Sequence, residues 1–364
     1  MGFAHGLLFT VLLVIRGVRE ERASDLFLAS LLFAGCLLLL PTLLGFLDIH
    51  VLWNEWLFLP IDPGLLIGPL LYLFIVAHTN RAFRFTRQHL LHFIPFGIYA
   101  VYHLAIFAQG REFVFQWMDS IDLPYINPIY QLTTLVVMGL YLGMAIKHYR
   151  QYRQWVETEY VDPEPLRYPW ITRFLWAIAL TITATCLLRI VELLQFDFDF
   201  IQAWLSSTMV TICIYYISIA GFMSVRPPLA VKNSAPKTKT EPGNGSLDEA
   251  EISKELDRLI RFMESGKAYL DPDLSLSGVA RSLGVSRETV SAVINTGQGK
   301  NFRSFVNQYR VQAFKEAVAQ GQAEELTLFG LALECGFNSK ATFNRVFKQI
   351  EGVTPNAFAA SLKA

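Results

Sequence analysis

A short stretch near the carboxyl end of the chain, residues 338–348, divides into two chemically different helical faces. One face is apolar, and we expect it to be buried. Its members are Phe343, Val346, Phe347 and, one turn further on, Ile350. The other face is rich in hydrogen-bond donors and has no carboxylate, which suits a helix that lies against phosphates and base edges. Its members are Asn338, Ala341, Thr342, Asn344, Arg345 and Lys348. In a single amphipathic helix, the same residues would also be consistent with a face that is simply exposed to solvent.

The pattern occurs twice, because residues 274–286 align with residues 326–339 once Asn338 is treated as an insertion. Each copy has a capping hydroxyl, a close-packing alanine, a glycine that ends the first helix, and a serine that caps the second. These residues are Ser275, Ala280, Gly284 and Ser286 in the first copy and Thr327, Ala332, Gly336 and Ser339 in the second. The order is typical of a helix-turn-helix, and its repetition makes the signal specific.

Residues 274–362 resemble the DNA-binding domain of AraC-type (arabinose-regulator-type) bacterial transcription factors. The stretches that carry the resemblance are residues 284–286, 299–310, 332–339, 343–348 and 352–355. The chain departs from the family at Ala359, which follows Phe358 where the family often has an arginine. The resemblance implies that two helices read one face of the DNA about one turn apart. It also implies a regulator of a kind that often acts as a dimer.

Each second helix is expected to enter the major groove. In the first copy its outward face consists of Arg287, Glu288, Ser291, Ala292 and Asn295. Arg345 can pair with guanine, either Asn344 or Asn295 with adenine, and either Ala292 or Ala341 with a thymine methyl group. Phosphate contacts are expected from Lys300, Arg303 and Lys340.

The chain as a whole is too apolar for a soluble protein of this size. The 364 residues are 53% hydrophobic and 17% charged, with a mean hydropathy of +0.35. Most of the apolar stretches approach the roughly 20 residues that a spanning helix needs. They cover residues 2–15, 24–47, 64–78, 90–108, 128–148, 171–194 and 204–223. Any one stretch could be a buried core helix, but seven in succession predict an all-α chain with a seven-helix transmembrane bundle followed by a soluble domain.

Lysine and arginine alternate between the loops of this predicted bundle. The first, third and fifth loops contain Arg16, Arg19, Arg22, Arg81, Arg84, Arg87, Lys147, Arg150, Arg153, Arg167 and Arg173. The other three loops are mainly acidic, so the amino terminus is predicted outside and the carboxyl end in the cytoplasm of a bacterial inner membrane. The predicted domains are residues 1–225 in the membrane, a flexible basic linker at 226–246, and the DNA-binding domain at 247–364.

One pair of opposite charges lies well inside a predicted span. Arg189 and Glu192 are three residues apart and therefore on one helix face. Charges at such depth are costly and often functional, so the pair is a candidate signal site. A self-neutralising pair, or an arginine that reaches outward to the interface, is the structural alternative.

Other functional classes have little support in the sequence. The four cysteines have no metal-ligand spacing, and the metalloprotease, nucleophile-elbow and P-loop motifs do not occur. We therefore expect no enzyme activity and no cofactor. The expected partners are double-stranded DNA, the lipid bilayer, a second copy of the chain and RNA polymerase. The alternative is a membrane receptor or transporter-like protein whose DNA-binding domain is accessory.

Overall fold

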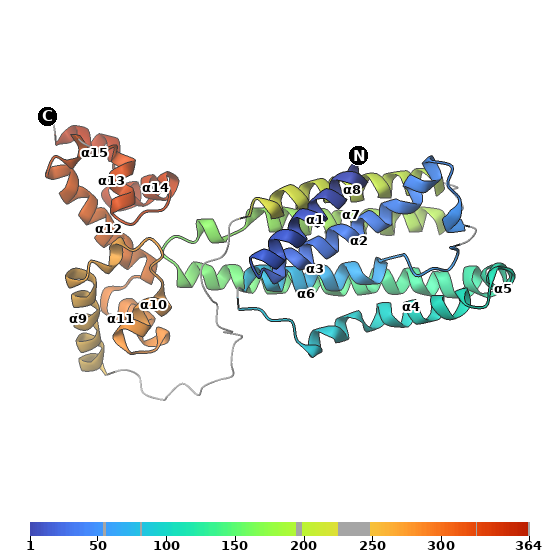
Figure 1. Cartoon of the computed structure of the whole chain (residues 1–364). Coiled ribbons are helices and arrows are strands. Elements are labelled where there is room, and N and C mark those ends of the chain that lie inside the picture. Colours follow the sequence, from blue (N-terminus) through green and yellow to red (C-terminus); the bar gives the residue numbers. More distant parts are fainter. Residues whose placement is uncertain (54–55, 81, 194–198, 225–247, 325, 363–364) are drawn as a thin grey trace. The chain divides into compact units, whose positions relative to one another are not determined.

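The computed structural model describes the chain except for residues 54–55, 81, 194–198, 225–247, 325 and 363–364. The regular elements of the described part are all helical, and its one isolated β-bridge pairs Tyr160 with Ser275. The predicted all-α class is confirmed there. The chain divides into two compact units, and each is described separately below (Figure 1). The first contains Met1–Gln151 and Tyr168–Asn233, and the second contains Tyr152–Arg167 and Ser234–Ala364.

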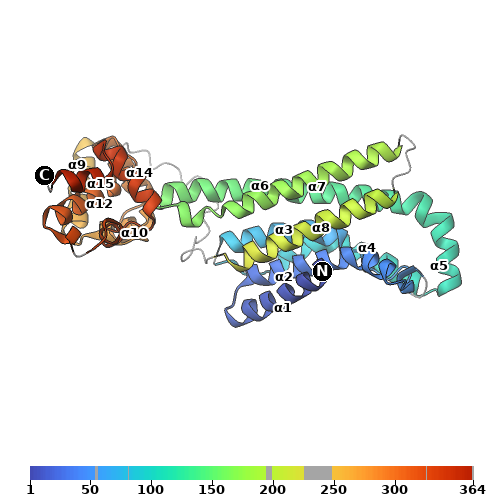
Figure 2. The same ribbon diagram turned by 90° about the horizontal axis from the view of Figure 1, so that it is seen from above.

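The first unit is built mainly from apolar helices. They are α1 (Gly2–Arg19), α2 (Ala23–Phe46), α3 (Gly64–Thr79), α4 (Ile94–Phe107), α5 (Arg111–Trp117), α6 (Asn127–Glu159), α7 (Pro169–Leu193) and α8 (Asp199–Phe222). The last residues of α6 belong to the second unit. Helices α1, α2 and α8 pack against one another, α2 also packs on α3, and α7 packs on α8 (Figure 2). Short 3₁₀ helices cover Val51–Trp53 and Arg87–Phe93.

Six described segments are long and apolar enough to cross a membrane. Helix α3 is apolar but shorter, with 16 residues, which at the rise of an α-helix is about 24 Å against a hydrocarbon core of about 30 Å. Large apolar side chains point outward from these helices, among them Leu8, Val11, Ile98, Val101, Leu132 and Val136. The unit is therefore compatible with membrane insertion, while the count of seven spans stays a prediction.

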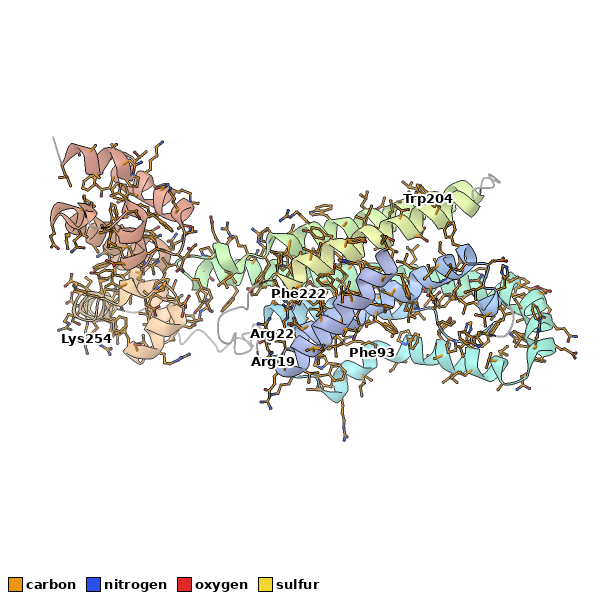
Figure 3. The ribbon with its side chains drawn as sticks, turned by 45° about the horizontal axis from the view of Figure 1, so that its top comes forward. Arg19, Arg22, Phe93, Trp204, Phe222 and Lys254 are labelled. Atoms are coloured by element: carbon orange, nitrogen blue, oxygen red, sulfur yellow. The ribbon has the colours of Figure 1, made fainter. Side chains whose placement is uncertain are left out.

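An ion pair that the sequence analysis did not anticipate joins three of these helices. Arg16 of α1 donates from Nε to the Asp25 carboxylate of α2 and from Nη1 to the Phe222 carbonyl of α8. Figure 3 labels Phe222, at the end of α8, and Arg22, at the turn between α1 and α2. Arg16 and Asp25 are mostly buried, so the pair fixes where the three helix ends meet.

Helix α6 is longer than the sequence pattern indicates. We expected the apolar stretch to end at residue 148, but the helix continues to Glu159, and its residues from Tyr152 onward belong to the second unit. Residues 149–159 are polar but include no proline or glycine, so nothing in them stops a helix. Before α6, where we expected a loop, α5 and a π-helix (Met118–Ile126) continue the helical path.

The second unit holds two helix-turn-helix copies. Its helices are α9 (Glu249–Ser265), α10 (Leu276–Leu283), α11 (Arg287–Gln298), α12 (Phe302–Ala319), α13 (Leu328–Glu334), α14 (Lys340–Glu351) and α15 (Pro355–Ser361). Helices α10 and α11 form the first copy, α13 and α14 form the second, and α12 joins them. Every cap predicted from the repeat pattern is confirmed by a side-chain hydrogen bond, at Ser275, Ser286, Thr327 and Ser339.

Each copy has its own apolar core, and Arg310 of α12 lies between them. The first core contains Val279, Val290 and Ile294, and the second contains Phe314, Phe343 and Phe347, together with other residues. Arg310 is fully buried. Burial lowers the pKa of its guanidinium to about 10, so the group is still protonated at neutral pH.

The buried Arg310 binds the chain that precedes the first copy and contacts the second copy. Its Nε donates to the Tyr269 carbonyl at 2.8 Å, and its Nη2 donates to the Asp271 carbonyl at 2.7 Å. The guanidinium also lies 5.9 Å from the ring centroid of Phe337. Because charge-assisted hydrogen bonds are the stronger kind, this residue fixes the spacing of the two copies.

Gly336 permits this junction, and we predict that Gly336→Ala destabilises it. The glycine has φ +89°, and a Cβ there would lie 2.6 Å from the Tyr269 carbonyl oxygen. Left-handed backbone costs a non-glycine residue about 1–2 kcal/mol, and the contact with backbone should add about 1–3 kcal/mol. Hydrogen exchange of the full-length protein, measured by mass spectrometry over α10–α14, reports the loss.

Gly284→Ala is the matched control for this prediction. Gly284 also has a positive φ, +72°, but its Cβ would enter open space. It should cost only the backbone term, about 1–2 kcal/mol. Equal losses of protection in the two variants would show that the close approach at Gly336 contributes nothing.

Candidate nucleic-acid interface

Helices α11 and α14 begin in the same way, which places their first turns on equivalent parts of each copy. Gly284 and Gly336 turn the chain with positive φ. The Ser286 hydroxyl then accepts from the Thr289 amide at 3.0 Å, and the Ser339 hydroxyl accepts from the Thr342 amide at 3.1 Å. A helix fixed at its amino-terminal end presents the first-turn side chains that a recognition helix uses on DNA.

The second copy presents most of the predicted DNA-contacting residues to solvent. The exposed members are Asn338, Lys340, Ala341, Asn344, Arg345 and Lys348. Asn338 also donates from its amide to the Pro272 carbonyl at 3.1 Å, so the inserted residue ties the start of α14 to the first copy. These side chains can offer several donors and one guanidinium fork to base edges.

Two expectations for α14 are wrong about exposure. Thr342 was placed on the outward face but is only 1% exposed, because its hydroxyl accepts from Ser339 and donates to the Asp162 carboxylate at 3.4 Å. Ile350 was placed on the buried face but is 38% exposed, because it lies in the last turn of α14, beyond the rings that pack on Phe314.

The first copy is more mixed in charge and exposure. Glu288 and Asn295 are exposed, while Arg287, Ser291 and Ala292 are partly exposed. The Asn295 amide donates to the Ser291 hydroxyl at 3.4 Å. Arg287 lies 3.6 Å from the carboxylates of both Glu159 and Glu288. This arginine therefore faces two negative groups rather than open solvent.

The three residues expected to contact phosphates differ in their surroundings. Lys340 is exposed. Lys300 donates to the Gln308 side chain at 2.8 Å. Burial lowers the pKa of the Arg303 guanidinium, and the nearby Arg345 lowers it further, while Asp162 opposes the change. Arg303 of α12 and Arg345 of α14 therefore lie near enough to interact electrostatically, with the acidic Asp162 and Glu164 beside them.

The α6–α7 segment (Tyr152–Arg167) contacts both copies, which was not predicted. Glu159 accepts from the Ser277 amide of α10 at 2.8 Å, Asp162 binds Thr342 of α14, and Val161 lies in the first apolar core. Its acidic residues, Glu157, Glu159, Asp162 and Glu164, were the available signal. They were overlooked because only the basic residues of this loop bear on membrane orientation.

The comparison with known families agrees with this geometry. Residues 279–361, which span α11 to α15 and most of α10, match a family described as a helix-turn-helix domain. The match supports a DNA-binding transcription regulator of AraC type and double-stranded DNA as a partner. It covers less than half of the chain and leaves the first unit unassigned. Neither the curated proteins nor the solved structures contain a match to the chain.

We predict that Arg345→Ala weakens specific DNA binding and relaxes the choice of one base pair. Arg345 is exposed on α14, and loss of a bidentate contact to guanine costs about 1–3 kcal/mol. Selection of binding sites from random DNA, followed by titration, measures both effects. Unchanged affinity together with unchanged base preference would remove Arg345 from the interface.

Lys340→Ala should instead weaken binding to all sequences alike. Lys340 is an exposed cation at the first position of α14, where an ammonium can neutralise one phosphate. Its loss should reduce the slope of log affinity against log salt by about one. The measurement is a salt titration, and an altered base preference with an intact slope would contradict the assignment.

Proposed function

We propose that the chain is a membrane-embedded transcription regulator that binds specific DNA in the cytoplasm and responds to a membrane or envelope signal. The observation that carries the proposal is the pair of capped recognition helices, α11 and α14, on one rigid connecting helix. The exposed face of α14 carries amide, ammonium and guanidinium donors and no carboxylate. Such donors suit the major groove of double-stranded DNA.

The membrane part of the proposal is supported by the six long apolar segments and their outward apolar side chains. The proposed topology, with the amino terminus outside, follows from the basic loops and leaves the helix-turn-helix domain where DNA is found. The proposed linker, residues 226–246, lies outside the described residues. Dimerisation and contact with RNA polymerase are further parts of this proposal.

The decisive experiment places the full-length protein in lipid nanodiscs and selects ligands from a random double-stranded DNA library. The expected result is one enriched sequence that the Arg345→Ala protein no longer prefers. Glu334→Gln is a suitable control, because this exposed carboxylate lies on α13, outside the predicted contacts. Absence of any enrichment in the wild type and in every variant would overturn the proposal.

Arg189 and Glu192 remain the proposed signal site. Both lie in α7, but their side chains are outside the described part of the structure. Glu192→Gln should leave the arginine unpaired and bias the bundle toward a state that solvates it, because an uncompensated buried charge is strongly destabilising.

In a transcriptional reporter strain, we predict that Glu192→Gln gives output that no longer depends on the signal, at unchanged protein level. The measurement is reporter output across a range of envelope conditions, with immunoblotting of the membrane fraction. A normal dose-response at normal abundance would show that the pair has only a structural role.

A further inference from the structure

The α6–α7 segment bridges the two helix-turn-helix copies. Tyr160 forms a β-bridge with Ser275, the cap of α10. Val161, the next residue, is 1% exposed and packs with the first apolar core. Asp162 then reaches Thr342 in the first turn of α14. Figures 1 and 2 both show the end of α6 next to α10. Three successive residues thus anchor the segment across both copies.

The segment brings two buried carboxylates to this surface. Glu159 is 2% exposed and Asp162 is 5% exposed. One oxygen of Glu159 accepts from the Ser277 amide, while the other lies 3.6 Å from Arg287. Asp162 accepts from Thr342, and its negative charge raises the pKa of the Arg303 and Arg310 guanidinium groups against the lowering effect of burial. An oxyanion held by a helix-start amide, a hydroxyl and arginines has the surroundings that a DNA phosphate would have.

These contacts are incomplete. Glu159 Oε2 and Asp162 Oδ2 are buried and accept no hydrogen bond among the described residues, although Glu159 Oε2 faces Arg287 at 3.6 Å. A buried carboxylate oxygen without a donor opposes docking, because water would have satisfied it. Weaker docking of the segment makes its release easier.

The docked segment occupies groups that DNA would need. Arg287 is the first residue of α11, and Thr342 lies in the first turn of α14. Residues at the amino-terminal end of a recognition helix are the ones that contact base edges. While Arg287 faces the Glu159 carboxylate, part of its charge is neutralised, and Thr342 is covered while Asp162 is in place.

We infer that the α6–α7 segment is an intramolecular competitor of DNA, which occupies Arg287 of α11 and Thr342 of α14 and must leave before specific DNA can bind. The inference rests on the proposed function. The competitor is part of the same chain, so docking needs no second molecule and is favoured by a high effective concentration. Since the segment joins α6 directly to α7, displacement of either helix end acts on it through the chain.

The opposite role gives a different experimental outcome. A segment that contacts both copies could brace α11 and α14 in the arrangement that DNA requires. Removing its contacts would then weaken DNA binding, whereas removing a competitor strengthens it. The sign of the change in affinity therefore separates the two roles.

The first test uses the full-length protein in nanodiscs and the DNA sequence that the selection experiment enriches. The Glu159→Gln/Asp162→Asn variant keeps the shape of the segment and removes both charges. If docking leaves about one molecule in ten competent, release raises the apparent affinity about tenfold. Unchanged or weaker binding would overturn the inference.

Glu157→Gln is the matched control. Glu157 belongs to the same segment and the substitution removes the same charge, but its carboxylate pairs with Arg153 and Arg167 inside the segment. It should change DNA affinity less than twofold. A gain equal to that of the double variant would attribute the effect to general charge and not to the docked contacts, and would also overturn the inference.

A second test locks the segment in place. Tyr160 and Ser275 are bridge partners, so Tyr160→Cys/Ser275→Cys allows a disulfide across the docked contact. After oxidation by diamide, specific DNA binding should fall at least about tenfold, by the same population argument. Reduction should restore it, and each single variant should be insensitive to the oxidant. DNA binding that is equally strong with the disulfide formed would overturn the inference.

The two proposals fail in different ways. If neither the wild type nor the charge-neutralised variant enriches any DNA sequence, the proposed function fails and the inference fails with it. If the wild type binds specific DNA and neither the substitutions nor the disulfide alters that binding as stated, the proposed function stands and the inference alone fails. Binding by the charge-neutralised variant where the wild type shows none would support both.

Discussion

The buried guanidinium of Arg310 is the constraint on which the DNA-binding unit depends. It donates to two backbone carbonyls before the first helix-turn-helix copy and lies near the Phe337 ring in the turn of the second copy. A charge in this position is acceptable because backbone oxygens compensate it, and a single glycine makes room for the approach. The two recognition helices therefore have a fixed separation that is set inside the protein, not by the DNA that they meet.

The buried charges of the α6–α7 segment are negative, and their hydrogen bonding is less complete than that of Arg310. Whereas Arg310 donates to two backbone carbonyls, Glu159 and Asp162 each keep one buried oxygen that accepts no hydrogen bond in the described part of the chain, and the Glu159 oxygen faces Arg287 at 3.6 Å. The apolar Val161 favours docking, while the carboxylates both attract the surrounding cations and retain a desolvation cost. The second unit thus contains a buried arginine, Arg310, and two buried carboxylates, Glu159 and Asp162, that accept fewer hydrogen bonds. The difference between them separates a structural contact from the reversible contact that we infer.

Local features of the sequence were enough to predict the helix-turn-helix elements. The hydroxyl caps and Gly284 affect only residues close to them in the sequence, so their effect can be predicted from one sequence. The burial of Thr342 was not predictable in that way, because the residue that covers it is 180 positions earlier. The extension of α6 to Glu159 was missed because hydropathy identifies where a membrane span ends, and a polar helix can continue beyond that point. The predicted DNA contacts, the orientation in the membrane and the signal site depend on partners that a single chain does not display.

The inserted Asn338 makes the two copies unequal. Its amide is held by the Pro272 carbonyl, so α14 begins in surroundings that α11 does not share. The first copy also carries the exposed carboxylate of Glu288, which can accept from cytosine, whereas the equivalent face of α14 has no acid. If both helices of one chain contact DNA as we propose, the bound site is asymmetric and not a palindrome. Each bound copy then has a defined direction along the DNA, and reversing the site would reverse the orientation of the protein relative to the start of transcription.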